Sequence, residues 1–575
     1  MKKWLLLIGF IGILVIISII IAGLAVRGMI GSDPVKISSD SILNLDLGGY
    51  YPEVSEDDVS DAILSKEAIT HRRLELMFDT AKTDGRIKEL YIDMSDFGGM
   101  GWARAKEIRN WILNFKTSGK PVTVYMDFVG DRTYYVATAA DKIVMPPEGG
   151  LLVNGIALQM FFLKGSFDKI GIEWEEFHAG KYKSAPETLT RENMSQVNRE
   201  AKTLLINDIF DELVSAIAEA RGMTESTVKE IIDNGPYLVI DEALEAGLID
   251  QINYESDLLE KIGGEDDEYE TVSGKDYMRE CEFPSSGKKF ALIFAVGEIV
   301  SGDGTSGQFV GSKSMTRWIR EAAEDEETKA ILIRVDSPGG SALASDIIWR
   351  EIIQAREKKP IVVSMGDLAA SGGYYISAPA NYIFAEPTTI TGSIGVFGIR
   401  PVMGNLFKMI GANTETILKG KNSNLFDSSK LMSPEQRSIV EKSINQTYDT
   451  FLERVSEGRS MDYDDVHAVA QGRVWTGNQA LERGLVDDIG DLTAAVEKAK
   501  ELAEIDNDQQ VWLDVYPRKK DLFEILREKD FPFASTKKYG MLPKELQKAA
   551  EIYHWQKLYR PEEPLARLPY IITAE

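Results

Sequence analysis

The chain has 575 residues, with 65 Lys and Arg against 91 Asp and Glu and a formal net charge of −26 at pH 7. It is too long for one ordinary domain, so two or more hydrophobic cores are expected. The acidic excess argues against nucleic-acid binding through a basic face, and a single cysteine, Cys281, excludes an intramolecular disulfide.

The first segment of the chain is apolar. Residues 4–26, WLLLIGFIGILVIISIIIAGLAV, carry no charge and follow Lys2 and Lys3. At about 1.5 Å per residue this run can cross a bilayer as a helix, and it exceeds the roughly 7–15 apolar residues of a cleaved signal peptide. The two lysines favour a cytoplasmic N-terminus. We therefore predict a single-pass anchor over 1–30 in a bacterial cytoplasmic (inner) membrane, with the body on the periplasmic side.

The body of the chain contains two similar copies of one sequence unit. YYVATAADKIVMPPEGGLLVNGI begins at Tyr134 and YYISAPANYIFAEPTTITGSIGV begins at Tyr374, an offset of 374 − 134 = 240 residues. Other segments match in the same order, for example LYIDMSDFGGMGWARAKEIRNWI with ILIRVDSPGGSALASDIIWREI. A repeat of this length indicates a duplicated domain, because solenoid units repeat every 20–50 residues or so.

Within each copy, apolar β-rich runs alternate with helical stretches. AILIRVDSP (330–338) is typical of a short buried strand that ends in a turn, and a helical pattern follows it up to Lys359. This alternation predicts βαβ crossovers around a mostly parallel sheet, and therefore an α/β fold in each half. The predicted parts after the anchor are a first repeat over 38–262, a linker over 263–287, a second repeat over 288–500 and a C-terminal extension over 501–575.

Two turns of small residues in the second copy are candidates for chemistry. DSPGG (336–340) follows a buried strand, and AASGG (369–373) precedes a helical stretch. Small neighbours would let a substrate approach Ser371 as a nucleophile, and the backbone N–H groups of Gly340 and Gly372 could form an oxyanion hole. In the alternative, purely structural interpretation, the DSPGG turn only connects a strand to a helix, and Ser371 is a helix N-cap.

A serine nucleophile needs a base. Of the four histidines only His178 lies close to a candidate motif. A lysine can serve only if burial lowers its pKa by several units, so that the amine is neutral. In HAGKYKSAPE, Lys183 stands between Tyr182 and small residues that could bury it, and Lys181 is the rival. On these residues alone, both lysines can equally be solvated loop residues.

Two serines could orient a lysine base. Ser393 lies in TGSIG (391–395), and Ser184 directly follows Lys183. Either hydroxyl could hydrogen-bond the amine. The alternative interpretation of TGSIG is a glycine-rich connection with no catalytic part.

The two copies have lost different residues. Asp131 stands where the second copy has Ser371, and Ser423 stands where the first copy has Lys183. A plausible nucleophile thus survives in one half and a plausible base in the other. The pattern predicts one active site assembled from both halves, and leaves open whether the two residues meet within one chain or between neighbouring chains.

The motifs DSPGG, AASGGYYIS, TGSIGVFG and GKYKSAPE, in tandem halves behind an apolar N-terminus, resemble the signal peptide peptidase A (protease IV) family in its long form. The resemblance extends from the anchor to about residue 500. It implies a Clp-protease/crotonase-like fold in each half and a Ser–Lys dyad, with Ser371 as nucleophile and Lys183, rather than Lys181, as general base. It also implies a homo-oligomer, for which a tetramer is expected.

The resulting expectation is a membrane-anchored serine endopeptidase that degrades released signal peptides and other short or unfolded peptides. Its expected partners are peptide substrates and membrane lipid, with no cofactor, no metal ion and no nucleic acid. One alternative is a crotonase-like acyl-CoA enzyme, which typically uses acidic side chains rather than a Ser–Lys pair. The other is a membrane-tethered scaffold with a decayed protease site, against which the retained AASGG and YKS motifs argue.

Overall fold

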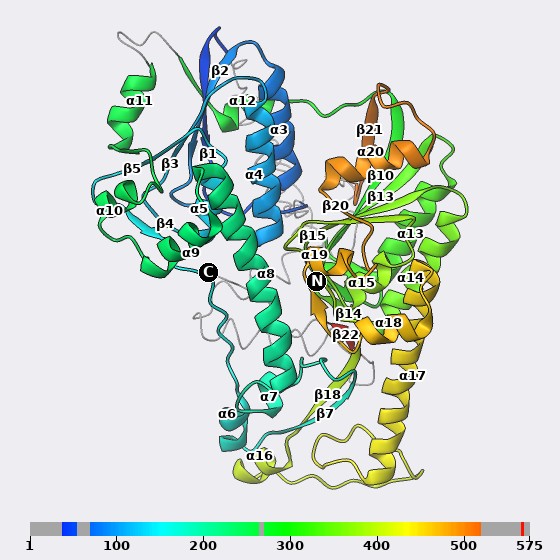
Figure 1. Cartoon of the computed structure of the whole chain (residues 1–575). Helices are drawn as coiled ribbons and strands as arrows, with labels where there is room; N and C mark the ends of the chain where they lie inside the picture. Colours follow the sequence, from blue (N-terminus) through cyan, green and yellow to red (C-terminus); the bar gives the residue numbers. More distant parts are fainter. Residues whose placement is uncertain (1–36, 55–68, 264–269, 519–564, 568–575) are drawn as a thin grey trace, which may run out of the picture.

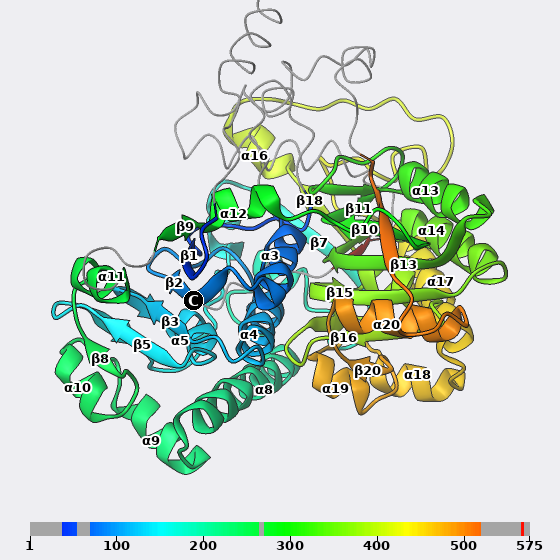
Figure 2. The ribbon, with the colours of Figure 1, turned by 90° about the horizontal axis from the view of Figure 1, so that it is seen from above.

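A computed structural model describes residues 37–54, 69–263, 270–518 and 565–567 of the chain (Figure 1). The predicted anchor over 1–30 lies outside these residues. Within the described ranges, no helix has the length and apolar character needed to cross a membrane. Two α/β lobes, one from each repeat, lie side by side, as Figure 2 shows from above.

The first lobe is built on a parallel six-stranded sheet in the order β8-β5-β3-β2-β1-β9. Its strands are β1 (Ser41–Asp46), β2 (Ile87–Asp93), β3 (Val122–Tyr125), β5 (Lys142–Met145), β8 (Gln251–Ile252) and β9 (Thr271–Ser273). Strand β3 is buried along its whole length, as expected for a parallel sheet that is covered on both faces. A separate parallel pair is formed by β4 (Phe128–Gly130) and β6 (Gly150–Leu152).

Helices pack around this sheet and extend from it. The longest, α8, reaches from the first lobe to the second, where the Leu204 carbonyl accepts a hydrogen bond from Gln479 (Figure 2). The helices of the first repeat are α3 (His71–Thr83), α4 (Trp102–Lys116), α5 (Asp131–Ala137), α6 (Lys164–Lys169), α7 (Glu187–Thr190), α8 (Gln196–Arg221), α9 (Glu225–Asn234), α10 (Ile240–Glu245), α11 (Glu255–Gly263) and α12 (Gly274–Glu280).

The second lobe has an eight-stranded sheet in which β19-β17-β15-β13-β10-β21 form the main path, β16 pairs with β15 and β20 pairs with β16. All of these pairs are parallel except β17 with β19. Its strands are β10 (Lys288–Val296), β13 (Thr328–Ser337), β15 (Ile361–Ala370), β16 (Tyr382–Ala385), β17 (Ile390–Gly392), β19 (Val474–Trp475), β20 (Asp488–Ile489) and β21 (Val511–Tyr516). Its helices are α13 (Ser312–Glu324), α14 (Ala342–Arg356), α15 (Gly372–Ser377), α16 (Gly404–Met409), α17 (Pro434–Arg459), α18 (Tyr463–Val469), α19 (Gly477–Leu481) and α20 (Leu492–Leu502).

The observed lobes extend beyond the predicted repeat boundaries. The stretch predicted as a linker over 263–287 contains β9 and α12, and β9 pairs with β1 of the first sheet. The stretch predicted as an extension over 501–575 contains β21, which pairs with β10 in the same way. In each copy this late strand covers what would otherwise be an open sheet edge, so it belongs to the lobe.

A third sheet joins the two repeats, in the order β12-β11-β14-β22-β18-β7. Its strands are β7 (Glu173–Ala179), β11 (Glu298–Val300), β12 (Phe309–Gly311), β14 (Gly339–Ser341), β18 (Val396–Val402) and β22 (Leu565–Arg567). Strand β7 belongs to the first repeat but pairs antiparallel with β18 of the second, from Glu173–Val402 to Ala179–Val396. This crossing carries the residues that follow β7 onto the second lobe.

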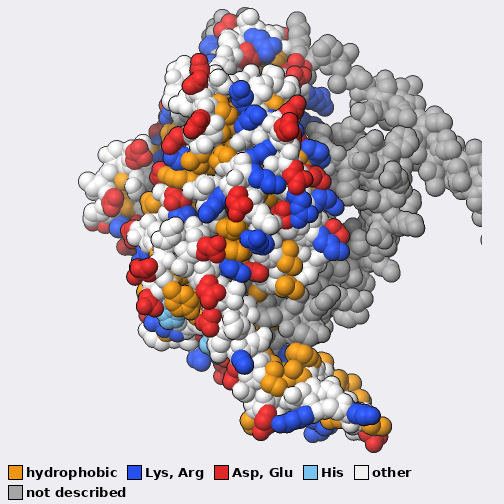
Figure 3. All heavy atoms as spheres, turned by 90° about the vertical axis from the view of Figure 1, so that its right-hand side faces the viewer, with side chains coloured by type: hydrophobic (Ala, Val, Ile, Leu, Met, Phe, Trp, Pro, Cys, Tyr) orange, Lys and Arg blue, Asp and Glu red, His pale blue; other side chains and the backbone are white. Residues whose placement is uncertain are grey.

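One end of the molecule projects away from both lobes. This arm consists of residues 161–179 and 396–432, and it contains α6, β7, β18 and α16 at the bottom of Figure 1. In Figure 3 hydrophobic side chains gather on the projecting end, whereas acidic and basic side chains are mixed over the lobe above it. The large exposed hydrophobic residues of the arm are Phe161, Leu163, Ile170, Met409, Ile410, Ile417, Leu418, Phe426 and Leu431. A surface of this kind is typical of a contact with a protein or a membrane.

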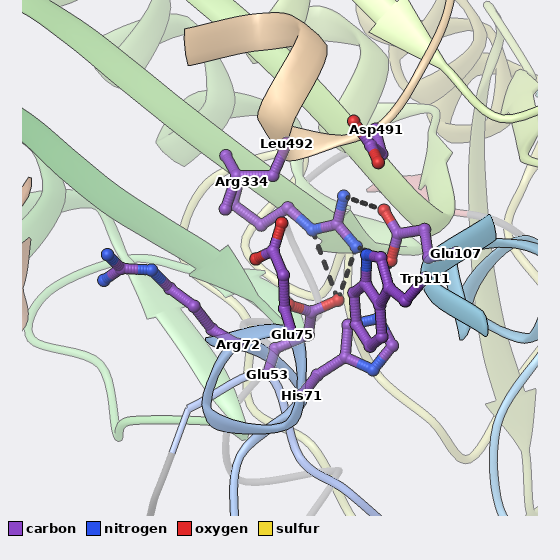
Figure 4. Close-up of a pocket in the computed structure, with 9 residues that line it drawn as sticks. All are labelled: Glu53, His71, Arg72, Glu75, Glu107, Trp111, Arg334, Asp491 and Leu492. Carbon is purple, nitrogen blue, oxygen red and sulfur yellow. Dashed lines mark hydrogen bonds and ion pairs between the residues drawn. The ribbon is translucent and has the colours of Figure 1, made fainter. Parts of the chain in front are cut away.

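A buried ionic cluster joins the two lobes (Figure 4). Arg334 of β13 is 1% exposed, and its guanidinium nitrogens lie 2.8 Å from Glu53 Oε1 and 2.8 Å from Glu107 Oε1 of the first repeat. His71 Nε2 lies 2.6 Å from the other oxygen of Glu107. Burial alone would raise the pKa of Glu107, but the Arg334 charge and the His71 contact outweigh it and hold that pKa at about 2. The carboxylate therefore stays charged inside the interface.

Replacing Arg334 by Met should destabilise the protein by about 3–5 kcal/mol, because Glu53 and Glu107 would be left buried without their cation. A matched control is Arg320→Met, since Arg320 also pairs with a glutamate, Glu351, but its side chain is 56% exposed. That change should cost less than about 1 kcal/mol. Urea unfolding of both variants measures the difference, and equally small losses would contradict the role given to Arg334.

Candidate active site

Ser371 lies at the turn between β15 and α15. Its φ of 55° and ψ of −112° are unusual for a residue other than glycine. The turn is held by two backbone hydrogen bonds of 2.8 Å, from Ser371 N to the Gly392 carbonyl and from Tyr375 N to the Ser371 carbonyl. Strained backbone of this kind is found at active sites when surrounding structure fixes it.

Lys183 reaches Ser371 from the other repeat. It lies four residues beyond the end of β7, whose pairing with β18 brings this loop to the second lobe. Its Nζ lies 2.8 Å from Ser371 Oγ, 3.0 Å from the Ser393 carbonyl oxygen and 3.0 Å from Ser393 Oγ. Residues that are 188 positions apart thus meet within one chain.

The Lys183 amine is removed from solvent. The residue is 2% exposed and Ser371 is fully buried. Burial lowers the pKa of Lys183 well below its usual value, because the charged ammonium would lose its hydration. A neutral amine has two N–H donors and one lone pair, which match the two oxygens of Ser393 and the hydroxyl of Ser371.

The other candidates from the sequence lie in different surroundings. Ser184 is buried next to Lys183, yet the described hydrogen bonds of the Lys183 amine go to Ser371 and Ser393. Lys181 is exposed, with its Nζ 4.7 Å from the ring centroid of Tyr182. His178 is exposed on β7.

A loop of the second repeat closes over Lys183. The Gln471 carbonyl accepts a hydrogen bond of 2.8 Å from Tyr182 N, and Gly472 N donates to the Ile394 carbonyl at 2.7 Å. Gly472 has a φ of 75°, and a Cβ added there would lie 2.6 Å from both N and Cβ of Lys183. The sequence around Gly472 reads as an ordinary turn and offers no signal of this contact.

The first repeat also holds strand β15, which ends at Ala370, directly before Ser371. Asp367 lies in β15, four residues before Ser371, and accepts hydrogen bonds from the backbone N–H groups of Gly101 (2.8 Å) and Arg104 (3.0 Å). The Arg104 guanidinium Nε lies 2.6 Å from the same carboxylate. Asp367 therefore ties strand β15 to the N-terminus of α4 in the first lobe.

The two glycines predicted as oxyanion donors lie close to the Ser371 turn. Gly372 is the first residue of α15, and the first N–H groups of a helix have no acceptor within it. Gly340 lies in β14, a strand that α15 contacts. A Cβ at Gly373 would lie 2.7 Å from the Ser337 carbonyl oxygen, so the close approach of α15 to the DSPGG turn requires glycine there.

Comparison with known proteins identifies the chain. Residues 114–266 and 353–506 match the model of Peptidase family S49. The chain belongs to peptidase family S49. Because the family occurs twice in one chain, this S49 peptidase has the tandem form of signal peptide peptidase A (protease IV) and is a serine peptidase.

Relatives match most of the chain. Serine protease SPPA, chloroplastic, of Arabidopsis thaliana is 36% identical over 493 residues, which cover 83% of this chain and 71% of the relative. Protease 4 of Salmonella typhi is 34% identical over 451 residues (76% and 72%), and Protease 4 of Haemophilus influenzae is 32% identical over 497 residues (82% and 80%). A solved structure, a ClpP1 mutant from Listeria monocytogenes, covers 35% of this chain and 91% of its own at 14% identity and a TM-score of 0.24.

In the S49 peptidase, the position equivalent to Ser371 in the first repeat and the position equivalent to Lys183 in the second repeat hold different side chains. Asp131 begins α5 as Ser371 precedes α15, and burial raises the pKa of this carboxyl to about 6. Its Oδ1 accepts a hydrogen bond of 3.3 Å from Gly155 N. Ser423, the equivalent of Lys183, is exposed, and its hydroxyl donates to the Gly420 carbonyl at 3.0 Å.

One group of side chains has the composition of a metal site. Glu53, His71 and Glu107 offer ligand atoms within 4.8 Å of one another. The Arg334 guanidinium, however, already binds both carboxylates and places a positive charge between them (Figure 4). A cation would be repelled there, so the cluster fits a structural ion network better than a metal centre.

Replacing Gly472 by Ala should displace Lys183 and slow the reaction of Ser371 with a fluorophosphonate by about 100-fold, because misplacing a catalytic group by about 1 Å has effects of that size. Gly484→Ala is the matched control. Gly484 has a similar φ of 68°, but the nearest atom to an added Cβ is Met461 Sδ at 3.8 Å. Labelling rates within about twofold of wild type are expected for this control. Equal losses in both variants would show that backbone strain, rather than contact with Lys183, explains the effect.

Proposed function

We propose that this S49 peptidase is a membrane-anchored endopeptidase in which Ser371 is the nucleophile and Lys183 of the other repeat is the general base. The observation that carries the proposal is the 2.8 Å contact between Lys183 Nζ and Ser371 Oγ in a site where both residues are buried. Burial favours the neutral amine, which is the form of lysine that can accept a proton.

The proposed reaction proceeds through an acyl-enzyme. Ser371 Oγ attacks the carbonyl carbon of a peptide bond while its proton passes to Lys183 Nζ. The two oxygens of Ser393 accept hydrogen bonds from the amine and point its lone pair at Ser371. The lysine then gives its proton to the leaving amine, and the C–N bond breaks. Water next attacks the ester with Lys183 again as base, which releases the acid and restores Ser371.

Two backbone donors complete the proposed site. The N–H groups of Gly340 and Gly372 would hold the negative charge that develops on the carbonyl oxygen in the transition state. The positions of the two glycines support this role, because Gly372 follows the proposed nucleophile and α15 contacts the strand that contains Gly340. A Clp-protease/crotonase-like arrangement of each half would supply donors at such turns.

The proposed substrates are released signal peptides and other short or unfolded peptides. An apolar N-terminal run over 4–26 would hold the enzyme at the membrane, where such apolar peptides collect, with the body outside the cytoplasm.

Protease added to intact spheroplasts should then digest the body, and complete protection of the body would contradict this orientation. We also propose a homo-oligomer, because the exposed hydrophobic residues of the arm offer a contact surface for another subunit.

Ser371→Ala and Lys183→Ala should each lower peptide hydrolysis by the purified protein at least about 10³-fold, because nucleophile and base act as a unit. The matched control is Lys181→Ala, which removes an exposed lysine two residues away and should leave the rate within about twofold. Circular dichroism checks that all three variants are folded. Near-normal activity of Lys183→Ala would contradict the proposed dyad.

The pH profile of the wild-type enzyme follows from the state of Lys183. Its pKa is lowered by burial, so the active neutral amine persists well below the usual pKa of a lysine. As the pH falls through the lowered pKa the amine is protonated and kcat/KM should decrease, with a slope of about one per pH unit. A rate that rises only near the pKa of an ordinary lysine would contradict a buried neutral base.

A further inference from the structure

Arg473, directly before β19, contacts both sides of the site that holds the Lys183 amine. Its carbonyl oxygen accepts a hydrogen bond of 2.7 Å from Ser393 N, and Ser393 in turn accepts two of the described hydrogen bonds of the amine. Its side chain reaches the other repeat, where the guanidinium carbon lies 4.8 Å from the ring centroid of Tyr182. Tyr182 is the residue directly before Lys183. Arg473 therefore links the acceptor of the lysine to the neighbour of the lysine.

The contact between Arg473 and Tyr182 combines stacking with hydrogen bonding. Arg473 Nη1 donates to the Tyr182 hydroxyl at 3.3 Å and lies 3.4 Å from Glu200 Oε1. The Tyr182 hydroxyl donates to the same carboxylate oxygen at 3.2 Å. The face of an aromatic ring attracts a guanidinium, and the attraction is stronger where water is partly excluded. The Arg473 side chain is 15% exposed and that of Glu200 is 48% exposed, so the ring contact is the sheltered one and the ion pair is the weaker one.

A second ring fixes the Arg473 guanidinium on its own repeat. The ring centroid of Trp475 lies 4.4 Å from the guanidinium carbon, and the buried indole N–H donates to the Val469 carbonyl at 2.9 Å. Trp475 belongs to β19, which pairs with β17. The last residue of β17, Gly392, accepts the backbone hydrogen bond of Ser371 N at 2.8 Å. The strand pair that anchors Arg473 therefore also holds the proposed nucleophile.

We propose that Arg473 is a positioning residue of the Ser–Lys dyad, which holds Tyr182 of the first repeat against the second and so keeps Lys183 aligned with Ser371 and sheltered from water. This inference rests on the proposed peptidase function of the same site. In the described contacts the guanidinium reaches neither Lys183 Nζ nor Ser371 Oγ, so its effect passes through Tyr182. Loss of the Arg473–Tyr182 contact would admit water to the amine, and hydration would return the pKa of Lys183 toward its usual value.

The test compares Arg473→Met with the matched control Arg483→Met. Arg483 also stacks on Trp475, with its guanidinium carbon 3.9 Å from the ring centroid. Its described hydrogen bonds, however, go to Gln479 and Glu482 of its own segment. Arg473→Met should lower kcat at pH 7 by at least about tenfold and leave KM within about twofold, because a displaced base slows the chemical step. It should also move the acid limb of the kcat/KM profile upward by about one pH unit. Arg483→Met should have neither effect.

Two further variants separate this contact from other roles of Arg473. Arg473→Lys keeps the positive charge but loses the planar group that stacks and donates at once, so it should restore only part of kcat. Full recovery would show that charge alone acts on Lys183 and would contradict the inference. Tyr182→Leu combined with Arg473→Met should shift the acid limb no further than the larger single shift, because both changes remove one contact. Additive shifts would overturn the inference, as would an unchanged pH profile in Arg473→Met.

Hydrogen exchange separates this inference from the proposed function, because it needs no hydrolysis. The N–H groups of Tyr182 and Ser184 each donate at 2.8 Å, to the carbonyls of Gln471 and Tyr182, and mass spectrometry of a peptide over 180–186 reports on both. Exchange there should be at least about fivefold faster in Arg473→Met than in wild type, and unchanged in Arg483→Met. Exchange in the rest of the chain checks that each variant is folded.

The two measurements together leave each proposal exposed to its own contradiction. Faster exchange at 180–186 in a protein that never cleaves peptides would support the Arg473–Tyr182 contact and contradict the peptidase proposal. Peptide cleavage by wild type, with equal exchange in Arg473→Met and Arg483→Met, would contradict the positioning role alone.

Discussion

The contact between Lys183 Nζ and Ser371 Oγ depends on how the two repeats dock. Each residue belongs to a different repeat, and their 2.8 Å separation requires that a loop of the first repeat be sealed inside the second. The antiparallel pairing of β7 with β18 brings this loop across, and the loop at Gly472 closes it from the other side. A small shift between the lobes would separate the pair or let water reach the amine, and water would restore the ordinary pKa of the lysine.

Buried charges fix the relative position of the lobes. Arg334 binds Glu53 and Glu107 across the interface, and Asp367 binds Arg104 and the start of α4. Buried ion pairs contribute little net stability compared with apolar packing, but breaking one is costly, so they are suited to selecting a single docked arrangement. Asp336, the first residue of the DSPGG turn, lies in a region from which water is excluded, because burial raises the pKa of its carboxyl to about 7.

Much of the fold and of the candidate site was predictable from the sequence, because a duplication allows the two copies to be compared residue by residue. The α/β alternation predicted parallel sheets, and the S49 match confirms the family resemblance. The boundaries at 263–287 and 501–575 differ because β9 and β21 lie beyond the last recognisable part of each repeat. The exchange of β7 and the insertion of β22 depend on backbone pairing between distant segments, which local patterns do not encode. Arg334 did offer a signal, since a charge inside an apolar strand needs a buried partner.

The proposed dyad requires that Lys183 is folded as a neutral amine against Ser371, and the pH dependence of stability tests this requirement directly. In the unfolded chain the lysine holds a proton up to about pH 10.4, whereas the buried amine has lost it at lower pH. Between the two pKa values the unfolded state therefore binds one more proton, and the stability of wild type relative to Lys183→Met should rise by about 1.4 kcal/mol per pH unit. Other titrating groups cancel in the difference between the two proteins when both are unfolded in urea from pH 7 to 10. Parallel curves would show that Lys183 is charged in the folded protein and would contradict the account.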